Sequence, residues 1–416
     1  MMALEPRFWR LYASSATSNL ADGVGRTALP LLAASYTRSP VLIAGLVTFA
    51  FLPWLLFALP SGALVDRVDR RHAMAGANVV RAASTAVLAV LVLTHTANIG
   101  WIYTVAFALG MSETVYDSAS RAILPQVVAH RDLDRANSFL TVEETLGQTF
   151  LGAPIGSALF AVAVSIPLLI NAGGFTLAAL LVLTLRGSYR PKRATDAATS
   201  IRRDIVDGVQ WLTHHRFLRG LTLISAATGV FQSAANGVFV LYVLEELRLP
   251  SGDFGFVLFV AGLGGLAGGI GTPPLARRFG RGPMLTFGAT LSAVTMGAMG
   301  LTRNGLVGAA LFALSAAGVM VWNVLTMSLR QALIPQHLFG RVQGAYRTLV
   351  WGAIPVGALS GGFLADAIGV RPVFVLGGAG LLVCAGFLGR LVVVHKDQLV
   401  DEPLTSAETP LPATVN

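Results

Sequence analysis

Long apolar runs separated by short polar segments recur along the whole chain. A helix that spans a membrane needs about 20 predominantly apolar residues, and twelve runs are long enough. They lie near 12–36, 41–64, 73–95, 99–122, 139–163, 165–186, 220–244, 253–274, 283–302, 305–329, 343–366 and 372–395. The pattern predicts an all-α polytopic membrane protein with twelve transmembrane helices.

The longest polar segment, at about 187–219, divides these helices into two sets of six. The expected units are an N-terminal bundle at 1–186, a linker at 187–219, a C-terminal bundle at 220–395 and a disordered tail at 396–416. In the linker, Ile201, Ile205, Val209 and Leu212 have the spacing of one helix face. Such a helix would lie in the membrane interface or cross the linker in water.

The composition points the same way as the apolar pattern. Charged residues make up 12% of the chain and hydrophobic residues 54%, whereas soluble domains carry about 25% charged residues. The net charge of +9 would suit a nucleic acid, but the Arg residues fall in short clusters between apolar runs. We therefore expect a lipid bilayer and no nucleic acid as partner. The single cysteine, Cys384, provides neither a disulfide framework nor a cysteine metal site.

Lys and Arg gather on alternate loops. With the N terminus in the cytoplasm, the cytoplasmic loops and termini hold 24 of these residues and the opposite loops hold four. Because cytoplasmic loops are enriched in Lys and Arg, both termini are predicted to be cytoplasmic, in the cytoplasmic membrane. The first run contains Asp22 and Arg26 and is too long for a signal-peptide core, so we expect it to remain as helix 1.

The two sets of helices share short sequences at corresponding positions. Asp22-Gly23 in helix 1 corresponds to Asn236-Gly237 in helix 7, and Arg121–Gln126 after helix 4 corresponds to Gln331–Gln336 after helix 10. Matches at corresponding positions indicate a parallel duplication, which gives two pseudo-symmetric six-helix bundles.

A charged segment, Gly62-Ala-Leu-Val-Asp66-Arg67-Val-Asp69-Arg70-Arg71, joins the second and third runs. Gly62 would let two helices approach closely, and Asp66 and Arg70 have the spacing at which side chains meet on a helical turn. The segment resembles the loop signature G-x-x-x-D-R-x-x-R-R of the major facilitator superfamily. Taken alone, it would equally suit a basic loop that only sets topology.

The resemblance to this superfamily covers about 8–395 and implies two bundles that rock about a central cavity. It also implies that the charged segment, Arg67 included, is a conformational latch on the cytoplasmic side. In that latch Asp66 would lie near the N-terminal end of helix 11, with Arg70 and Arg71 on acids of helix 4. The Asp22-Gly23 step, Arg121-x-x-x-Pro125 and Arg341-Val-x-Gly-x-x-Arg347 resemble the branch of macrolide efflux proteins and enterobactin exporters.

Ionisable side chains inside a bilayer are costly and therefore mark candidate functional sites. Asp22 lies twelve residues past Arg10, or about 18 Å along a helix, which is near mid-membrane. A carboxylate removed from water takes up a proton more readily than an exposed one, so Asp22 is a candidate proton carrier. The alternative is a static ion pair with Arg26. The corresponding Asn236 cannot titrate, so only one half would carry this proton.

Helix 4 places Glu113, Asp117 and Arg121 on one stripe, because each lies four residues from the next. Glu113 and Asp117 are further candidate proton carriers, and Arg121 is a partner for their charge. For Asp117 and Arg121 the alternative is mutual neutralisation at the interface. Arg81 in helix 3 would either extend to the membrane surface or neutralise one of these acids.

Polar residues on several helices could line a substrate cavity, although helix–helix hydrogen bonds are the alternative for each of them. They are Asn19, Gln232, Asn236, Trp322 and Asn323. By contrast, Glu143 and Glu144 would lie one turn into helix 5, at the interface. Helix 4 has no Arg at mid-depth, and the glycine–proline signature of helix 5 in antiporters is only partly present in Gly152–Ser157.

Together these features favour a secondary transporter and not an enzyme. The resemblance suggests proton-coupled export of a small, partly hydrophobic compound such as a drug, antibiotic or siderophore. An importer of a metabolite is an alternative, and so is a non-transporting sensor or scaffold, which would have no need for mid-membrane acids. The proton gradient would supply the energy, with no cofactor or metal, and the chain would work as a monomer.

Overall fold

The computed structural model describes residues 4–190 and 201–396, and every element within them is a helix. The first half comprises α1 (Pro6–Tyr36), α2 (Pro40–Val65), α3 (Arg70–Leu93), α4 (Ile99–Val127), α5 (Leu133–Thr145), the π-helical turn η2 (Leu146–Gly152), α6 (Ala153–Val162) and α7 (Ile166–Leu183). The second half comprises α9 (Arg216–Gly237), α10 (Phe239–Leu241), η3 (Tyr242–Glu246), α11 (Phe254–Phe279), α12 (Arg281–Met299), α13 (Gly305–Leu333), α14 (Gln336–Ile368) and α15 (Val370–Val394). Between the halves lies α8 (Ile201–His214).

Several of these elements join into longer helices. The helix α5–η2–α6 is continuous over 133–162, and α9 continues through α10 and η3 with a bend of 45°. Within the described residues, eight helices are long and apolar enough to cross a membrane, or nine with the bent pair. The other long helices are α1, α4 and α12; α1 and α4 are interrupted by the polar and charged side chains that the sequence singles out. These twelve segments match the predicted set.

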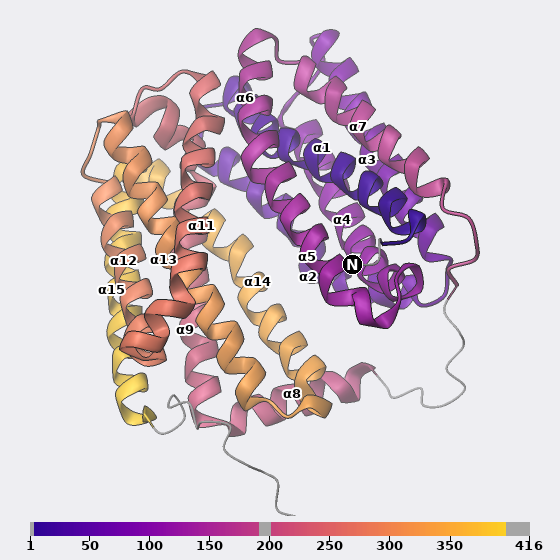
Figure 1. Ribbon diagram of the computed structural model, residues 1–416. Coiled ribbons are helices and arrows are strands. Elements are labelled where there is room, and N and C mark those ends of the chain that lie inside the picture. The colour runs from indigo at the N-terminus through magenta and orange to yellow at the C-terminus, as the bar shows by residue number, and fades with distance from the viewer. Residues whose placement is uncertain (1–3, 191–200, 397–416) are drawn as a thin grey trace, which may run out of the picture.

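The two halves pack in the same pattern. In the first, α3 packs on α4 and α7, α2 on α4, and α1 on α7 and α5–η2–α6. In the second, α12 packs on α13 and α15, α11 on α13, and α9 on α15 and α14. Figure 1 shows the two bundles side by side, joined where α2 meets α14 and where α6 meets α11. The repeated pattern confirms two pseudo-symmetric six-helix bundles.

Glycines allow the helices of each bundle to approach closely. A Cβ on Gly152 would lie 2.6 Å from the Cα of Gly23, and a Cβ on Gly23 would lie 2.5 Å from the carbonyl oxygen of Gln148. In the second bundle Gly357 contacts the backbone of α9 in the same way. Backbones this close leave α1 little freedom to rotate, which fixes the direction in which Asp22, beside Gly23, points.

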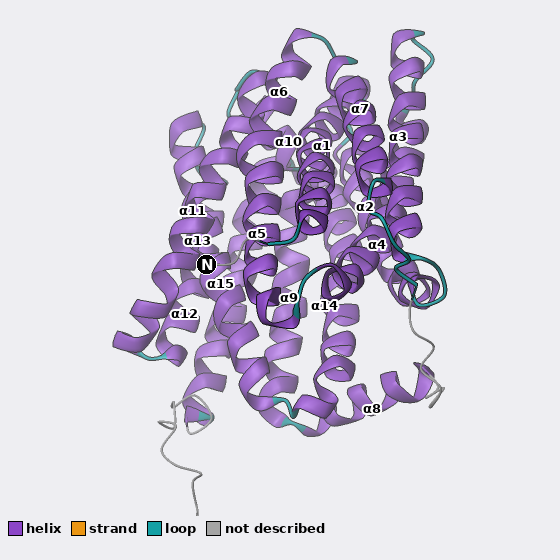
Figure 2. Ribbon diagram, turned by 45° about the vertical axis from the view of Figure 1, so that its right-hand side comes forward, coloured by secondary structure: helices purple, strands orange, loops and turns teal. Residues whose placement is uncertain are grey.

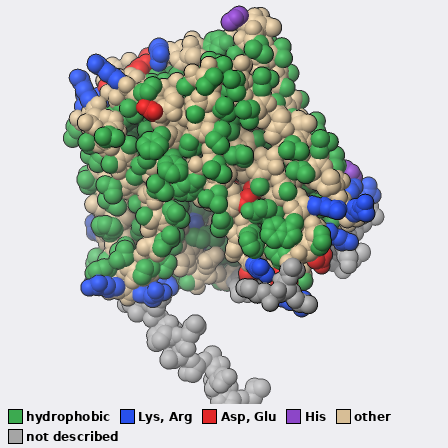
Figure 3. Space-filling view, turned by 45° about the horizontal axis from the view of Figure 1, so that its top comes forward, with side chains coloured by type: hydrophobic (Ala, Val, Ile, Leu, Met, Phe, Trp, Pro, Cys, Tyr) green, Lys and Arg blue, Asp and Glu red, His purple; other side chains and the backbone are tan. Residues whose placement is uncertain are grey.

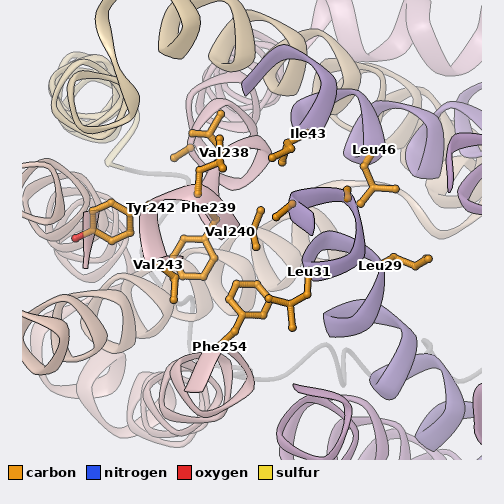
Figure 4. Packing of buried hydrophobic residues seen from close by; sticks show 14 of the residues in the cluster. Leu29, Leu31, Ile43, Leu46, Val238, Phe239, Val240, Tyr242, Val243 and Phe254 are labelled. Carbon is orange, nitrogen blue, oxygen red and sulfur yellow. The ribbon is translucent and has the colours of Figure 1, made fainter. Parts of the chain in front are cut away.

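The hydrophobic core shows where the bundles meet. One cluster combines residues of both halves, and Figure 4 shows Leu31 and Ile43 of the first beside Val240 and Phe254 of the second. Two further clusters each stay within one half, over 4–189 and over 212–392. These lie at the end that carries the charged segment and α8, which we call the basic end. The bundles thus share a core at the opposite end and have separate cores at the basic end.

The linker helix α8 lies across the basic end, as Figure 2 shows, and packs on α14. A Cβ on Gly208 would lie 2.5 Å from the carbonyl oxygen of Arg341. Leu212 is buried and Val209 is exposed. The side chains of Ile201 and Ile205 lie outside the described residues, as does the tail at 397–416. The apolar face of α8 and the disordered tail therefore stay predictions.

The lateral surface is apolar. In Figure 3 hydrophobic side chains are spread across the visible face, and Lys and Arg gather mainly at its margins. Large apolar side chains such as Phe363, Phe387 and Val90 are more than half exposed. Water-exposed surfaces rarely carry apolar patches of this extent, whereas lipid-facing surfaces do.

Candidate functional site

The first bundle buries an ion pair between α1 and α3. Arg81 is 1% exposed, and its Nη1 lies 3.1 Å from Oδ2 of Asp22. The same nitrogen donates to the Ser18 hydroxyl at 3.3 Å. The rings of Tyr116 and Phe175 flank the guanidinium, with their centroids 5.1 Å and 5.3 Å from its carbon. Two charges removed from water are stable only as a pair, so each of these residues depends on the other.

This ion pair rules out the static Asp22–Arg26 pair that was the alternative for Asp22. It also decides between the two expectations for Arg81. Asp22 does not pair with Arg26; instead Nη2 of Arg26 lies 3.6 Å from Oε1 of Glu113 on α4. Arg81 does not extend to the membrane surface but neutralises Asp22. The physical reason is that Asp22 already has a buried cation, whereas Arg26 is exposed and free to reach across to α4.

At the basic end of α4, Asp117 and Arg121 pair with each other. Arg121 Nη2 lies 3.5 Å from Oδ2 of Asp117, and both side chains are exposed by a third or more. This is the mutual neutralisation that the spacing allowed. Exposed pairs of this kind contribute about 0–1 kcal/mol, so the pair is free to exchange partners.

The two arginines that open α3 bind helix ends and not acids. Arg70 Nη1 donates to the carbonyl of Ala122 at 2.8 Å, and Arg71 Nη1 donates to the carbonyl of Leu185 at 2.7 Å. The Ala122 carbonyl lies in the last two turns of α4 and the Leu185 carbonyl just past the end of α7, where the partial negative charge of a helix C terminus attracts cations. The expected contacts of these arginines with acids of helix 4 are therefore not formed in this conformation.

The rest of the charged segment is split between buried and exposed groups. Asp69 is buried, caps α3, and accepts from the backbone N–H groups of Arg71 at 3.0 Å and Tyr189 at 3.1 Å; sequence reasoning gave it no role. Asp66 and Arg67 are exposed, and among the described residues Asp66 forms no ion pair. The expected contact of Asp66 with the start of α14 stays a prediction.

In this conformation Gly62 does not allow the close approach of two helices that the sequence suggested. A Cβ at Gly62 would meet no atom within 4 Å, so this glycine allows no close helix contact here. In this conformation α2 instead meets α14 farther from the basic end, where Trp54 contacts Trp351 with ring centroids 4.8 Å apart.

Sequence reasoning missed one buried carboxyl, Glu143. Helix 5 begins at Leu133, so Glu143 lies ten residues, or about 15 Å, into the helix and not at the interface. It is 4% exposed, and its Oε1 accepts from Asn19 Nδ2 at 2.8 Å. Glu144 lies at the same depth and likewise not at the interface; it is exposed to the cavity between α1, α4 and α5. The polar residues at 133–138 hid the first turns of this helix from an apolar count, although Asp132 before them is a typical helix-start residue.

A cavity of about 660 Å³ lies between the bundles. The first bundle contributes Arg26 and residues of α5–η2–α6, including Gln148, while α9, α11 and α13 of the second bundle supply most of the wall. Arg26 is the one charged side chain among the lining residues, all of which are described. Large apolar lining residues are Phe150, Phe239, Leu258, Leu266, Ile270, Met296, Met299, Phe312, Met320 and Phe374.

The five polar residues predicted for a substrate cavity lie in different places. Gln232 and Asn236 on α9 line the central cavity. Asn19 lines a separate cavity of about 280 Å³ between α1, α4 and α5. Trp322 is buried within the second bundle, and Asn323 is exposed without lining the central cavity.

Two duplicated six-helix bundles, a cavity between them and ionisable groups within the span define the fold of a secondary transporter. Residues 11–358 match the family model described as Major Facilitator Superfamily. This match covers well over half of the 416 residues, and the chain belongs to that superfamily.

Characterised relatives include efflux pumps. The chain is 29% identical over 392 residues to the multidrug efflux pump Tap of Mycolicibacterium fortuitum, covering 90% of this chain and 94% of the relative. It is 22% identical over 395 residues to macrolide efflux protein A of Streptococcus pyogenes, covering 93% and 96%. The chain is therefore a multi-pass membrane transporter with efflux-pump homologues.

Solved structures share the fold at low sequence identity. The nucleoside transporter NupG superposes with a TM-score of 0.75 at 13% identity, covering 93% of this chain and 99% of that one. A bacterial homologue of the iron transporter ferroportin superposes with a TM-score of 0.74 at 16% identity, covering 94% and 99%. These likenesses extend the assignment of the fold to nearly the whole chain.

Proposed function

We propose that the protein is a proton-coupled exporter of the cytoplasmic membrane, with both termini in the cytoplasm. It exchanges incoming protons for a small, partly hydrophobic compound. One observation carries this proposal: the buried ion pair of Asp22 and Arg81 lies in the first bundle, whereas apolar side chains of the second bundle form most of the central cavity. Movement of one bundle against the other can couple two such sites.

The cavity supports a partly hydrophobic substrate. Its volume of about 660 Å³ falls within the range of small-molecule sites, roughly 300–1,000 Å³. The wall is mostly aromatic and aliphatic, with a few polar groups from Gln148, Gln232, Asn236 and Arg26. A large apolar wall binds a ligand by removing apolar surface from water, and a few polar groups orient the ligand. Two relatives are named for the efflux of multiple drugs and of macrolides.

The ion pairs support coupling to protons. A proton on Asp22 would remove the charge that holds Arg81, so protonation requires the pair to rearrange. Glu113 and Asp117 are further proton-carrying groups, paired with Arg26 and Arg121. Because Arg26 also lines the central cavity, a substrate there can displace Arg26 from Glu113. Proton entry then supplies the energy, with no cofactor, and each monomer contains a complete pathway.

The separate cores at the basic end support a state open to the cytoplasm. In the opposite state the basic end closes, and the charged segment with Gly62, Asp66, Arg67, Arg70 and Arg71 acts as the latch against α14 and α4. Asp66 is exposed and without an ion pair among the described residues here, so it is available for a partner in the closed state.

The test is accumulation of ethidium, a fluorescent cationic dye, in inside-out vesicles under an imposed pH gradient. Wild type should accumulate the dye, and Asp22→Asn should not. Accumulation that Asp22→Asn leaves unchanged would assign the proton to Glu113. Dye movement in the same direction as the flow of protons would identify an importer instead. Binding of compounds without any movement would favour a sensor or scaffold.

A further inference from the structure

Glu143 is a buried carboxyl with fewer partners than its charge requires. Only 4% of the residue is exposed, and it lies where α5 faces α1. Its Oε1 accepts one hydrogen bond, from Asn19, whereas its Oε2 is buried and makes none. An ionised carboxylate removed from water needs a cation or several donors to offset the loss of hydration. One amide donor, with the Ser15 hydroxyl beside it and no cation, does not meet that requirement.

The neighbours of Glu143 offer no cation. On α1, Ser15 and Asn19 are its polar neighbours, and Asp22, one turn farther, is engaged by Arg81. On α4, Tyr116 lies within electrostatic range of Glu143. Glu144, next to it on its own helix, is exposed and adds a like charge. No Arg, Lys or His lies within 4.0 Å of the Glu143 carboxylate in the described part of the chain. Its environment is therefore unlike that of Asp22.

A hydrogen-bonded chain connects Glu143 to the substrate cavity. Asn19 donates to Glu143 and accepts, through Oδ1, from Nε2 of Gln148 at 2.9 Å. Gln148 lines the central cavity. On a regular α-helix, positions 143 and 148 would point about 140° apart, since each residue turns about 100°. The π-helical turn η2 is wider and turns less per residue, which brings both side chains within reach of Asn19.

A second cavity reaches from the polar neighbours of Glu143 toward the basic end. It has a volume of about 280 Å³ and is lined by residues of α1, α4 and α5. Glu143 itself does not line it, but its neighbours Ser15 and Asn19 do, and Arg121 and Asn137 line it toward the basic end. The Ser15 hydroxyl therefore offers a proton a route between Glu143 and this cavity that does not pass through the substrate cavity.

We propose that Glu143 is a further proton-carrying residue, and that Asn19 and Gln148 link its protonation to occupancy of the substrate cavity. This deepens the proposed exchange of protons for substrate and rests on it. In the state open to the basic end, the proton leaves the Glu143 carboxyl by way of the Ser15 hydroxyl, which lines the smaller cavity, and Asn19 donates to the carboxylate that remains. A substrate that engages the Gln148 amide competes with Asn19 for it. Proton and substrate then bind with reciprocal coupling.

The first measurement is infrared spectroscopy of the purified full-length protein during a pH titration. Wild type should show the carbonyl band of a buried protonated carboxyl that disappears as the pH rises. Glu143→Gln should lack that band, and Glu144→Gln, the same change at the exposed neighbour, should keep it. If Glu143→Gln keeps the band, the proposal is overturned. This arm requires no transport, so it stands even if the dye assay on wild type fails and the proposed function falls.

The second measurement separates a coupling role from a structural one. Glu143→Gln should abolish gradient-driven ethidium accumulation but keep downhill equilibration of the dye without a gradient. Glu143→Asp, which keeps the carboxyl, should restore part of the accumulation. Gln148→Leu should keep the infrared band but lose the shift of that band on addition of ethidium. Wild-type accumulation in Glu143→Gln, or an ethidium-induced band shift retained in Gln148→Leu, would refute the link.

Discussion

Arg81 holds Asp22 at 3.1 Å in the interior of the first bundle, although Arg26 lies much closer to Asp22 in sequence. The buried arginine comes from another helix, between two aromatic rings, and Arg26 pairs with Glu113 instead. Two ion pairs thus run from α1 to its neighbours, one enclosed and one at the edge of the central cavity. This arrangement lets Arg26 respond to substrate while Arg81 stays with the proton site.

The enclosed pair predicts a strong stability effect. Arg81→Met should lower the free energy of unfolding by about 3–5 kcal/mol, because it leaves the Asp22 carboxylate buried without its cation. Thermal unfolding of the protein in detergent would measure this change. Arg121→Met, which removes an exposed pair, should cost no more than about 1 kcal/mol. The double variant Asp22→Asn with Arg81→Met should recover part of the loss, and no recovery would mean that Arg81 stabilises the bundle by packing alone.

Helix packing around Asp22 provides a second prediction. Gly23→Ala should lower the free energy of unfolding by about 1–3 kcal/mol, because the new methyl group meets the backbone of Gln148. At Gly173, in α7, a Cβ would meet no atom within 4 Å. Gly173→Ala should therefore be neutral or stabilise by up to about 1 kcal/mol. Equal thermal unfolding temperatures for the two variants would contradict the close contact of α1 with η2.

The sequence predicted the architecture well because lipid imposes one simple rule, a long apolar run for each span. The correspondence of Asp22-Gly23 with Asn236-Gly237 indicated that the chain consists of two related halves. The matching helix contacts within the two halves agree with it. The charged segment indicated the superfamily, because its residues follow the loop signature of the family. These features are local in sequence and can be read without knowing which helices touch.

Contacts between helices were harder to predict. Asp22 pairs with Arg81 because Gly23 fixes the rotation of α1 against η2, and rotation does not show in an apolar count. Glu143 was placed at the interface because polar residues at 133–138 concealed the start of α5. Arg70 binds the carbonyl of Ala122, since a helix end competes with acids for a guanidinium.

The latch predicts a loss of transport without loss of protein. Asp66→Asn should reduce ethidium transport strongly, because the neutral side chain no longer interacts with the positive N-terminal end of α14 in the closed state. Quantitative immunoblotting of membranes should show normal abundance, since Asp66 is exposed and forms no ion pair among the described residues. Glu5→Gln is a matched control on the same side, with an exposed acid outside the latch. A fall in abundance with Asp66→Asn would instead indicate a folding role.

The end opposite the latch is closed in part by an ion pair between the bundles. Arg38 Nη1, after α1, lies 3.3 Å from Oε1 of Glu245 in η3, and both side chains are exposed. Because an exposed pair contributes about 0–1 kcal/mol, Glu245→Gln should raise the population open at that end by up to about fivefold. Cysteine labelling would measure this, with Asn236→Cys in the cavity, Cys384→Ala to remove the native thiol, and an impermeant maleimide added from outside.

The salt dependence of that labelling makes the prediction specific. Faster labelling in Glu245→Gln should be clear at low ionic strength and should fade at about 1 M salt, where charges are screened beyond about 3 Å. Glu246→Gln, the same change at the adjacent acid, should label at the wild-type rate, because Glu246 forms no ion pair in the described part of the chain. A wild-type labelling rate for Glu245→Gln at low salt would show that the apolar core shared by the two bundles holds this end closed by itself.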